Sequence, residues 1–414
     1  SSSYKMKTSL LNLIHIVGFI SIFSYSMPMN YLPVSLCTVS QLLLVILGSW
    51  KYKLCVNKRI LILILYVIAV SLLNSARITS VTLTTFIRFL VCILGSYFFA
   101  KSYEGNWRSF IKVYLKICIA FSVVSVIQEF GYLLNIPLLY DMSGLIGVSD
   151  INLDTSGPFL RCPSLTMEPA QISFLLFPAI YLKMSDFFNK TNYVPGKKIY
   201  TLILIGAFLT FTFTIFLFIL LAFCYFIFKR ISLNNLSYVV VICLAMIILL
   251  TSENNVSNKF RSLFVASEQL QSADNLSAFA LISNVLIAKD AAIDNPFGTG
   301  FFTTGQNYDT YIHHYFLITK DSLELNKDGG GVMYVKILSE YSFVGLFLFF
   351  IFILKLKNCK NPINISSLCI FLILCVRVDS YTSSLLFVFL SFVCITAFPK
   401  RNSNQDKFSI EINL

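Results

Sequence analysis

Long apolar runs alternate with short polar segments along most of the chain. A helix needs about 20 apolar residues to cross a bilayer, and this pattern predicts twelve such helices. They lie near residues 8–27, 31–50, 59–75, 79–100, 108–134, 169–185, 199–211, 212–229, 236–251, 332–354, 363–379 and 381–398. The sequence therefore predicts an all-α polytopic membrane protein with about 12 transmembrane helices.

The apolar run over 199–228 is too long for a single crossing. Thr210, Thr212 and Thr214 mark its middle, so we expect two helices that meet there. An unbroken helix would reverse the orientation of every later segment. The predicted topology therefore depends on this break.

The composition agrees with a membrane protein. Of the 414 residues 57% are hydrophobic and only 13% are charged, whereas soluble domains carry roughly 25% charged residues. This balance excludes a soluble fold, an intrinsically disordered chain and a nucleic-acid-binding protein.

The net charge of +12 is interpreted as an orientation signal. Lys and Arg concentrate in the cytoplasmic loops of membrane proteins. With the N-terminus inside, 20 of the 32 basic residues fall in predicted cytoplasmic segments and seven fall on the other side. Both termini are therefore predicted to be cytoplasmic, and the excess of positive charge requires no nucleic acid as a partner.

Two loops are much longer than the rest, and both fall on the predicted outer, periplasmic side. The expected organisation is helices 1–5 over 1–134, a first large loop over 135–168, helices 6–9 over 169–251, a second large loop over 252–330, helices 10–12 over 331–398 and a cytoplasmic tail over 399–414. Loops of this length are usually functional or disordered. Apolar stretches at 276–288 and 311–319 predict helices that cover the membrane face, which is typical of enzymes acting at a lipid interface.

Cysteine usage points to neither a disulfide scaffold nor a metal centre. Ten of the 11 Cys lie in or beside apolar runs, as small buried residues do, and only Cys162 falls in a long polar loop. No CxxC motif and no His/Cys cluster has metal-ligand spacing. We therefore expect no metal and no cofactor.

The first candidate for chemistry lies at the end of the first large loop, between Arg161 and Pro169. Pro169 suits the first turn of a helix, which would place the Glu168 carboxylate beside the positive end of the helix dipole. Glu168 is then either a structural residue or a general base facing a cavity, with Arg161 as a bidentate anion-binding group.

The second candidate group lies in the second large loop. Arg261 comes early in the loop, near the expected membrane surface, and a turn-rich segment over 295–300 precedes His313 and His314. Adjacent residues of a helix or strand point apart, so joint metal ligation by the two His is not expected. Either one takes part in chemistry, or both are solvated loop residues.

Ionisable residues inside predicted membrane helices are costly and are functional candidates by default. Arg88 lies deep in the fourth helix and cannot lose its charge, so we expect it to face a polar cavity or a carboxylate. Arg377 lies near the outer end of the eleventh helix, and Lys336 and Glu340 are spaced i, i+4 and are interpreted as a structural pair. Two further residues, Glu129 and Asp379, complete the set.

Arg161, Arg261 and Arg377 are all predicted to lie at or near the outer surface. Three fixed positive charges that meet there would bind an anionic substrate group such as a pyrophosphate, with Arg88 as a further candidate. The sequence alone does not show that they meet.

These features together resemble the O-antigen polymerase (Wzy-type) family, within the O-antigen ligase and polymerase superfamily. The resemblance covers most of the chain and rests on the helix count, the two enlarged loops and motifs in a fixed order. The motifs are Arg161 to Pro169, the early loop residue Arg261, Asn295-Pro-Phe-Gly-Thr-Gly300, and Gly329-Gly-Gly331 leading into Leu338-Ser-Glu340-Tyr-Ser-Phe-Val-Gly345. A His-Asn that ligase-like members often carry is replaced by Gly330 and Gly331, which favours a polymerase.

The resemblance implies a GT-C-like fold in a bacterial inner membrane and a metal-independent, inverting glycosyl transfer at the periplasmic face. The donor would be a glycan on undecaprenyl pyrophosphate and the acceptor a lipid-linked repeat unit. Arginines would hold the pyrophosphate while the polyprenyl tail stays in lipid, and Glu168, His313 or His314 would take the acceptor proton. Implied partners are a chain-length regulator and a flippase.

Two other functions fit a similar length and helix count. One is a flippase for lipid-linked oligosaccharides, although short, even loops would be expected of it. The other is the ligase that transfers finished polymer to lipid A core.

Overall fold

The computed structural model describes residues 2–24, 35–146, 153, 155–156, 158–190, 197–228, 276–314, 327–328, 330–378, 380–381, 383–397 and 409–412. This part of the chain is mostly helical. The long helices are α1 (Ser2–Phe23), α2 (Leu36–Lys51), α3 (Lys58–Leu73), α4 (Ser80–Ser102), α5 (Trp107–Leu133), α8 (Pro169–Asn189), α9 (Lys197–Leu209), α10 (Phe213–Phe228), α13 (Leu276–Asp294), α15 (Met333–Leu356), α16 (Pro362–Arg377) and α17 (Ser384–Ala397).

The short elements lie between these helices. They are β1 (Leu54–Asn57), η1 (Ser75–Arg77), α6 (Pro137–Tyr140), α7 (Ser143–Ile146), β2 (Thr155–Ser156), β3 (Phe159–Leu160), α14 (Thr304–Tyr311), η4 (Ile312–His314) and β4 (Ser409–Ile412). The strands form two antiparallel pairs, β1 with β4 and β2 with β3.

Eleven of the twelve predicted apolar segments coincide with helices, and the segment near 236–251 lies outside the described residues. Within the described chain, three helices are long and apolar enough to cross a membrane, namely Ser80–Ser102, Trp107–Leu133 and Met333–Leu356, and shorter apolar helices accompany them. This composition is that of an all-α, membrane-embedded protein.

The predicted break in the 199–228 run is confirmed. α9 ends at Leu209 and α10 begins at Phe213, with Phe211 in the left-handed region (φ 42). The start of α8 lies against this break and its end lies against the start of α9, because Ser173 bonds to Thr212 whereas Lys183 lies over the ring of Tyr200. α10 runs parallel to α8, because the ring of Phe177 packs against Phe218 and the ring of Tyr181 packs against Phe226. The chain therefore reverses direction between α9 and α10.

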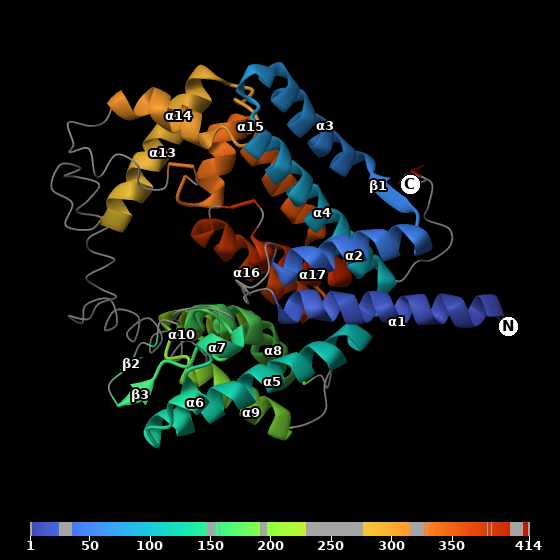
Figure 1. Cartoon of the computed structure of the whole chain (residues 1–414), viewed down its shortest axis with the longest axis vertical. Coiled ribbons are helices and arrows are strands. Elements are labelled where there is room, and N and C mark those ends of the chain that lie inside the picture. The colour runs from blue at the N-terminus through green and yellow to red at the C-terminus, as the bar shows by residue number, and fades with distance from the viewer. Residues whose placement is uncertain are drawn as a thin grey trace.

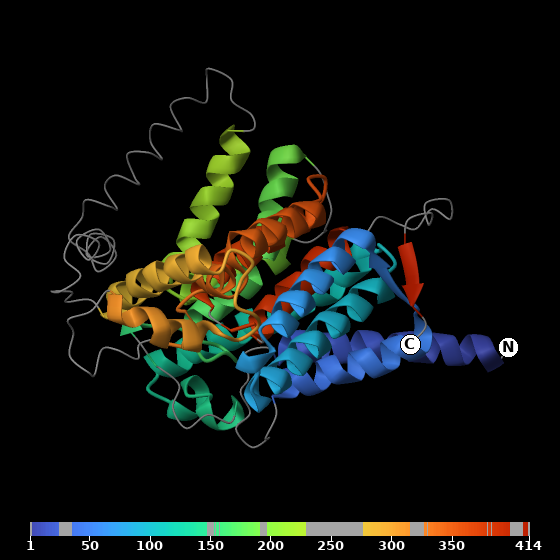
Figure 2. The same ribbon diagram turned by 90° about the horizontal axis from the view of Figure 1, so that it is seen from above.

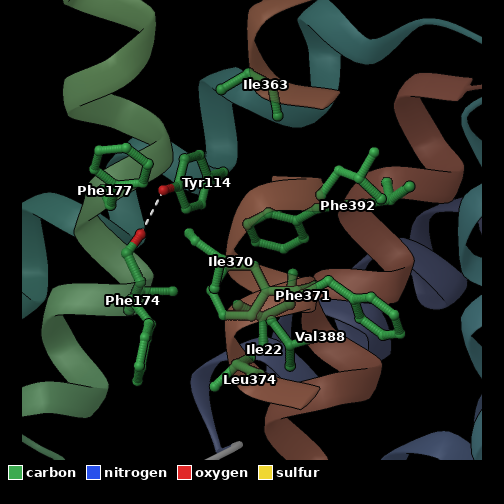
Figure 3. Packing of buried hydrophobic residues seen from close by; sticks show 14 of the residues in the cluster. Ile22, Tyr114, Phe174, Phe177, Ile363, Ile370, Phe371, Leu374, Val388 and Phe392 are labelled. Atoms are coloured by element: carbon green, nitrogen blue, oxygen red, sulfur yellow. Dashed lines mark hydrogen bonds between the residues drawn. The ribbon is translucent and has the colours of Figure 1, made fainter. Parts of the chain in front are cut away.

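One continuous apolar core joins the helices. α8 and α5 meet α16 and α17 in it, and Figure 3 shows Phe174 and Phe177 facing Ile370 and Phe371, with Tyr114 between them. The Tyr114 hydroxyl donates to the carbonyl of Leu175 (Figure 3). Glycines allow close approach elsewhere: a Cβ on Gly206 of α9 would lie 2.6 Å from the Cβ of Ser122 on α5. Such small-residue contacts stabilise helix packing in lipid, where apolar burial contributes little.

Both large-loop regions lie toward the same end of the molecule. In Figures 1 and 2, β2, β3, α13 and α14 lie at the left, whereas the two chain termini lie at the right. We call the left end the lid end. The side of a membrane that each end faces stays a prediction.

Candidate functional site

The loop that carries Arg161 is anchored by the last turns of α5. The buried Gln128 side chain accepts from the Ser164 amide (2.7 Å) and donates to the Ser164 carbonyl (3.2 Å), while the Ser164 hydroxyl donates to the carbonyl of Phe121 (2.8 Å). Ser164 itself has φ 52. These bonds compensate a backbone conformation that a residue with a Cβ rarely adopts, so the loop is held at a defined place.

Glu129, predicted as a functional candidate inside a helix, is the second anchor. It is 7% exposed, and its Oε2 accepts from the Leu160 amide (3.2 Å) and from the Cys162 thiol (3.6 Å). These two residues flank Arg161, which is half-buried. Burial raises the pKa of the Cys162 thiol, and the Glu129 carboxylate raises it further. Glu129 therefore positions Arg161.

Glu168 lies where the sequence placed it, immediately before Pro169 at the start of α8. Its side chain is exposed and does not make the capping hydrogen bond to the helix amides. Cys162, six residues earlier, donates its amide to the carbonyl of Leu209 (3.0 Å). Arg161 and Glu168 thus lie on one loop that packs beside the reversal between α9 and α10.

Arg377 is the last residue of α16 and belongs to the same end of the bundle as the start of α8. α16 packs against α8, and in Figure 3 Leu374 lies toward the Phe174 side whereas Ile363 lies toward the Phe177 side. The two helices are therefore antiparallel. The first turn of α15 contacts the end of α16, because the Tyr334 hydroxyl donates to the carbonyl of Leu372 (3.1 Å).

Three chain segments that are distant in sequence thus lie toward the same end of the bundle: the Arg161–Glu168 loop, the end of α16 and the start of α15. We call this end the convergence region. Arg261, the third predicted arginine, and Asp379 lie outside the described residues. A shared arginine site stays a prediction.

Arg88 does not meet the expectation of a polar cavity or a carboxylate. Its side chain is exposed on the side of α4, and its Nη2 lies 3.5 Å from the hydroxyl of Thr38 in the first turn of α2. α4 packs on α2 through the same side of the helix, because Gly95, two turns after Arg88, lies against Gln41. Arg88 therefore lies at the exposed edge of the contact between α2 and α4, and the expectation of a polar cavity or a carboxylate was wrong.

α15 is broken nine residues after its start at Met333. Ser342 has φ 57 and ψ −168, a conformation outside the helix. The break leaves carbonyls of the preceding turn available to other segments. The Glu340 carbonyl accepts hydrogen bonds from the amides of Thr299 (2.8 Å) and Gly300 (3.0 Å). The Tyr341 carbonyl accepts one from the Tyr66 hydroxyl (2.9 Å). Non-helical backbone at membrane depth is tolerated only where protein satisfies it.

The turn over 295–300 is the element that satisfies these carbonyls. Gly298 (φ 97) and Gly300 (φ 104) are left-handed, and a Cβ on Gly298 would lie 2.5 Å from the Glu340 carbonyl oxygen. Only glycine permits both the conformation and the approach. The structure therefore gives the predicted Asn-Pro-Phe-Gly-Thr-Gly segment a physical role, which is docking on α15.

Asn307 of α14 reinforces the docking. The side chain of Asn307 is 1% exposed. Its Nδ2 donates to the Ser339 carbonyl (3.0 Å), the Ser339 hydroxyl (3.0 Å) and the Thr299 hydroxyl (2.9 Å). Its Oδ1 accepts a hydrogen bond from Arg77 (3.1 Å). Asn307 was not among the sequence candidates. A polar residue between apolar stretches of a long loop was the only available signal.

Lys336 and Glu340, interpreted from sequence as a pair, make their hydrogen bonds to other groups. Lys336, 2% exposed, donates to the Asp328 carbonyl (2.9 Å) and lies over the rings of Phe302 (4.6 Å) and Tyr381 (5.2 Å). Glu340 is fully buried, and its Oε1 accepts from the Thr304 hydroxyl (2.7 Å). The two charges still interact electrostatically one helical turn apart.

The predicted helices of the second large loop are only partly confirmed. α13 covers the stretch expected at 276–288, but the next helix, α14, comes before the stretch expected at 311–319. Of that stretch, 312–314 is the single turn η4 and 315–319 lies outside the described residues.

His313 and His314 are both exposed in η4, where His314 Nδ1 lies 3.5 Å from Asp290 Oδ2 of α13. Among the described residues no three His, Cys, Asp or Glu side chains are grouped as metal ligands. All three candidate proton acceptors are exposed, and only Glu168 shares a loop with Arg161.

Comparisons of this chain with protein-family models, with curated proteins and with solved structures found no match. The family resemblance therefore rests on sequence features alone, namely the helix count, the enlarged loops and the motifs.

Proposed function

We propose that the chain is a membrane-embedded glycosyltransferase of the O-antigen polymerase type, with a GT-C-like fold. It transfers a glycan from undecaprenyl pyrophosphate to a lipid-linked repeat unit at the periplasmic face. The observation that carries this proposal is the convergence region. It brings Arg161, Glu168 and the end of α16, with Arg377, to the same end of an apolar bundle as the α13–α14 lid.

The physical logic follows from the chemistry of such a donor. A polyprenyl tail stays in lipid while its diphosphate lies at the interface, where guanidinium groups bind it bidentately. In an inverting transfer, the acceptor hydroxyl oxygen bonds to the anomeric carbon as the bond from that carbon to the diphosphate breaks. The diphosphate leaves with the electron pair, and the arginines stabilise its developing charge. Glu168 takes the acceptor proton.

A reconstitution experiment tests the proposal. Purified protein in lipid vesicles receives the undecaprenyl-pyrophosphate-linked repeat unit extracted from cells that make the chain. A ladder of lipid-linked oligomers is expected. Movement of this substrate across the bilayer without new bonds would identify a flippase, and a requirement for lipid A core would identify a ligase.

Variants test the arginine site directly. Arg161→Ala and Arg261→Ala are expected to lower polymer formation about 100-fold or more, which is the scale for one lost transition-state contact. Glu168→Gln keeps the shape and removes the proton acceptor, so it should slow the transfer without weakening substrate binding. Arg108→Ala, which removes a charge from the start of α5, is the matched control and should form polymer normally. Normal polymer in both Arg161→Ala and Arg261→Ala would contradict the diphosphate site.

A further inference from the structure

An exposed arginine lies within an apolar outer face of the bundle. Arg88 is on the face that α2 and α4 form together, and the side chains around it are apolar and exposed: Val81 57%, Ile87 53% and Leu42 47%. A guanidinium stays charged in every protein environment. On a surface that faces lipid, its available anionic partner is a lipid phosphate.

Polar and aromatic residues near the C-terminal ends of α2 and α4 mark one edge of the bilayer on this face, the edge farther from Arg88. Trp50, at the end of α2, is 76% exposed, and the ammonium groups of Lys51 and Lys101 lie 5.6 and 5.9 Å from the ring of Tyr52. Exposed Trp and Tyr with Lys are typical of the membrane interface. We call these residues the aromatic belt.

The distance along α4 places Arg88 near the other edge. Lys101 follows Arg88 by 13 residues (101 − 88), which is ~20 Å at ~1.5 Å per residue. The hydrocarbon layer is about 30 Å thick, so the Arg88 Cα lies ~10 Å inside the far boundary. Helical side chains lean toward the helix N-terminus, here toward the lid end, and long basic side chains extend to the interface in this way.

The residues around Arg88 also fit a phosphate. The Thr38 hydroxyl lies 3.5 Å from its Nη2, and the Ser35 hydroxyl lies 2.8 Å from that of Thr38. One guanidinium and nearby hydroxyls match the single negative charge of a phosphodiester, whereas a diphosphate would bring more charge than one arginine balances. The α2–α4 face has no acidic side chain in either helix, so nothing there would receive the ammonium of a zwitterionic headgroup.

We propose that Arg88 and Thr38 form a binding site for an anionic phospholipid, with phosphatidylglycerol as its representative, in the leaflet at the lid end. The lipid phosphate accepts from the guanidinium and from the Thr38 hydroxyl, and its acyl chains lie along α2 and α4. This site is separate from the convergence region and does not depend on the proposed glycosyl transfer.

The test measures thermal unfolding of the detergent-solubilised protein during titration with phosphatidylglycerol. The unfolding midpoint of the wild-type chain should rise, and Arg88→Leu should raise the lipid concentration for half of this effect about fivefold, the factor expected for one interfacial basic residue. Arg88→Lys should show a smaller loss. Arg108→Gln, which removes a guanidinium at the other end of the bundle, should respond as the wild-type chain does.

The outcomes separate this site from its alternatives. If Arg88 were only structural, Arg88→Leu would lower the midpoint without added lipid and keep the full response, which would overturn the proposal. A response through Arg88 to undecaprenyl phosphate but not to phosphatidylglycerol would also overturn it. Native mass spectrometry provides a second reading: Arg88→Leu should retain one phosphatidylglycerol molecule fewer than Arg108→Gln, and an equal number would contradict the site.

Discussion

Replacing Asn307 by alanine tests whether hydrogen bonds to the broken turn of α15 hold the lid in place. The side-chain amide shares its two N–H donors among three oxygen atoms, and its oxygen accepts a hydrogen bond from Arg77. A typical hydrogen bond contributes about 0.5–1.5 kcal/mol net. The Ser339 carbonyl keeps the hydroxyl of Thr299 as a donor (3.2 Å), and Thr299 keeps Thr303 (2.6 Å).

Because the Ser339 carbonyl and the Thr299 hydroxyl keep partners, neither of them pays the penalty for an unsatisfied buried group. The loss should then be about 2 kcal/mol, which corresponds to ~30-fold in the equilibrium between the docked and the opened turn. The amides of Thr299 and Gly300 report this opening directly, since both donate to the Glu340 carbonyl only while the turn is docked. In hydrogen exchange, both amides should exchange ~30-fold faster in Asn307→Ala.

Gln306→Ala is the matched control on the same helix. Gln306 is exposed and makes one 3.2 Å bond to the Arg77 carbonyl, so its removal should change exchange by no more than about twofold. Exchange at Thr299 and Gly300 within twofold of the wild-type rate in Asn307→Ala would refute the reasoning. An equal acceleration in every helix would refute it too, because it would mean global destabilisation.

Three further predictions concern the other end of the site. Glu129→Ala removes the acceptor of the buried Leu160 amide, so a local loss of stability of about 1–3 kcal/mol is expected. Proteolysis of the 158–166 loop should be faster and polymer formation weaker. A loop as resistant to protease as in the wild-type chain would contradict the anchoring role. The raised pKa of Cys162 keeps this residue a thiol at neutral and mildly alkaline pH, so maleimide should label the exposed Cys359 first. Labelling of Cys162 should increase only as the pH rises further. Equal labelling rates of the two cysteines at neutral pH would count against the burial of Cys162. Gly206→Val should prevent α5 and α9 from packing and lower the yield of folded protein in detergent, whereas Gly144→Val, at a glycine with open space around it, should not.

The helices were largely predictable because apolar length is a strong local signal. The break at Thr210–Thr212 was found from three hydroxyl residues inside one apolar run, and the start of α8 was found from Pro169. These features act within a few residues of the chain. They are therefore visible in the sequence without knowledge of the fold.

The side-chain environments were less predictable because they depend on contacts between distant segments. Arg88 was expected to face a polar cavity or a carboxylate, but the side of α4 that packs on α2 is decided by the contact between Gly95 and Gln41 on two different helices. Lys336 and Glu340 have the spacing of a helical pair, yet α14 and the turn before it supply other partners. Glu129 was chosen as a candidate for its charge. Its hydrogen bonds to Leu160 and Cys162 join a helix to a loop about 30 residues away, so only the structure could show them.

The break at Ser342 has a consequence for exchanging parts between related chains. Carbonyls of the turn before it accept from the 295–300 turn and from Tyr66 of α3. If the 276–314 region alone were transplanted into a related chain, the carbonyls of the recipient's α15 would face a turn that did not evolve with them. Their hydrogen bonds within the apolar core would then be at risk. Chimaeras should therefore carry 276–342 as one module, joined after Ser342, and they should keep a tyrosine at the position of Tyr66.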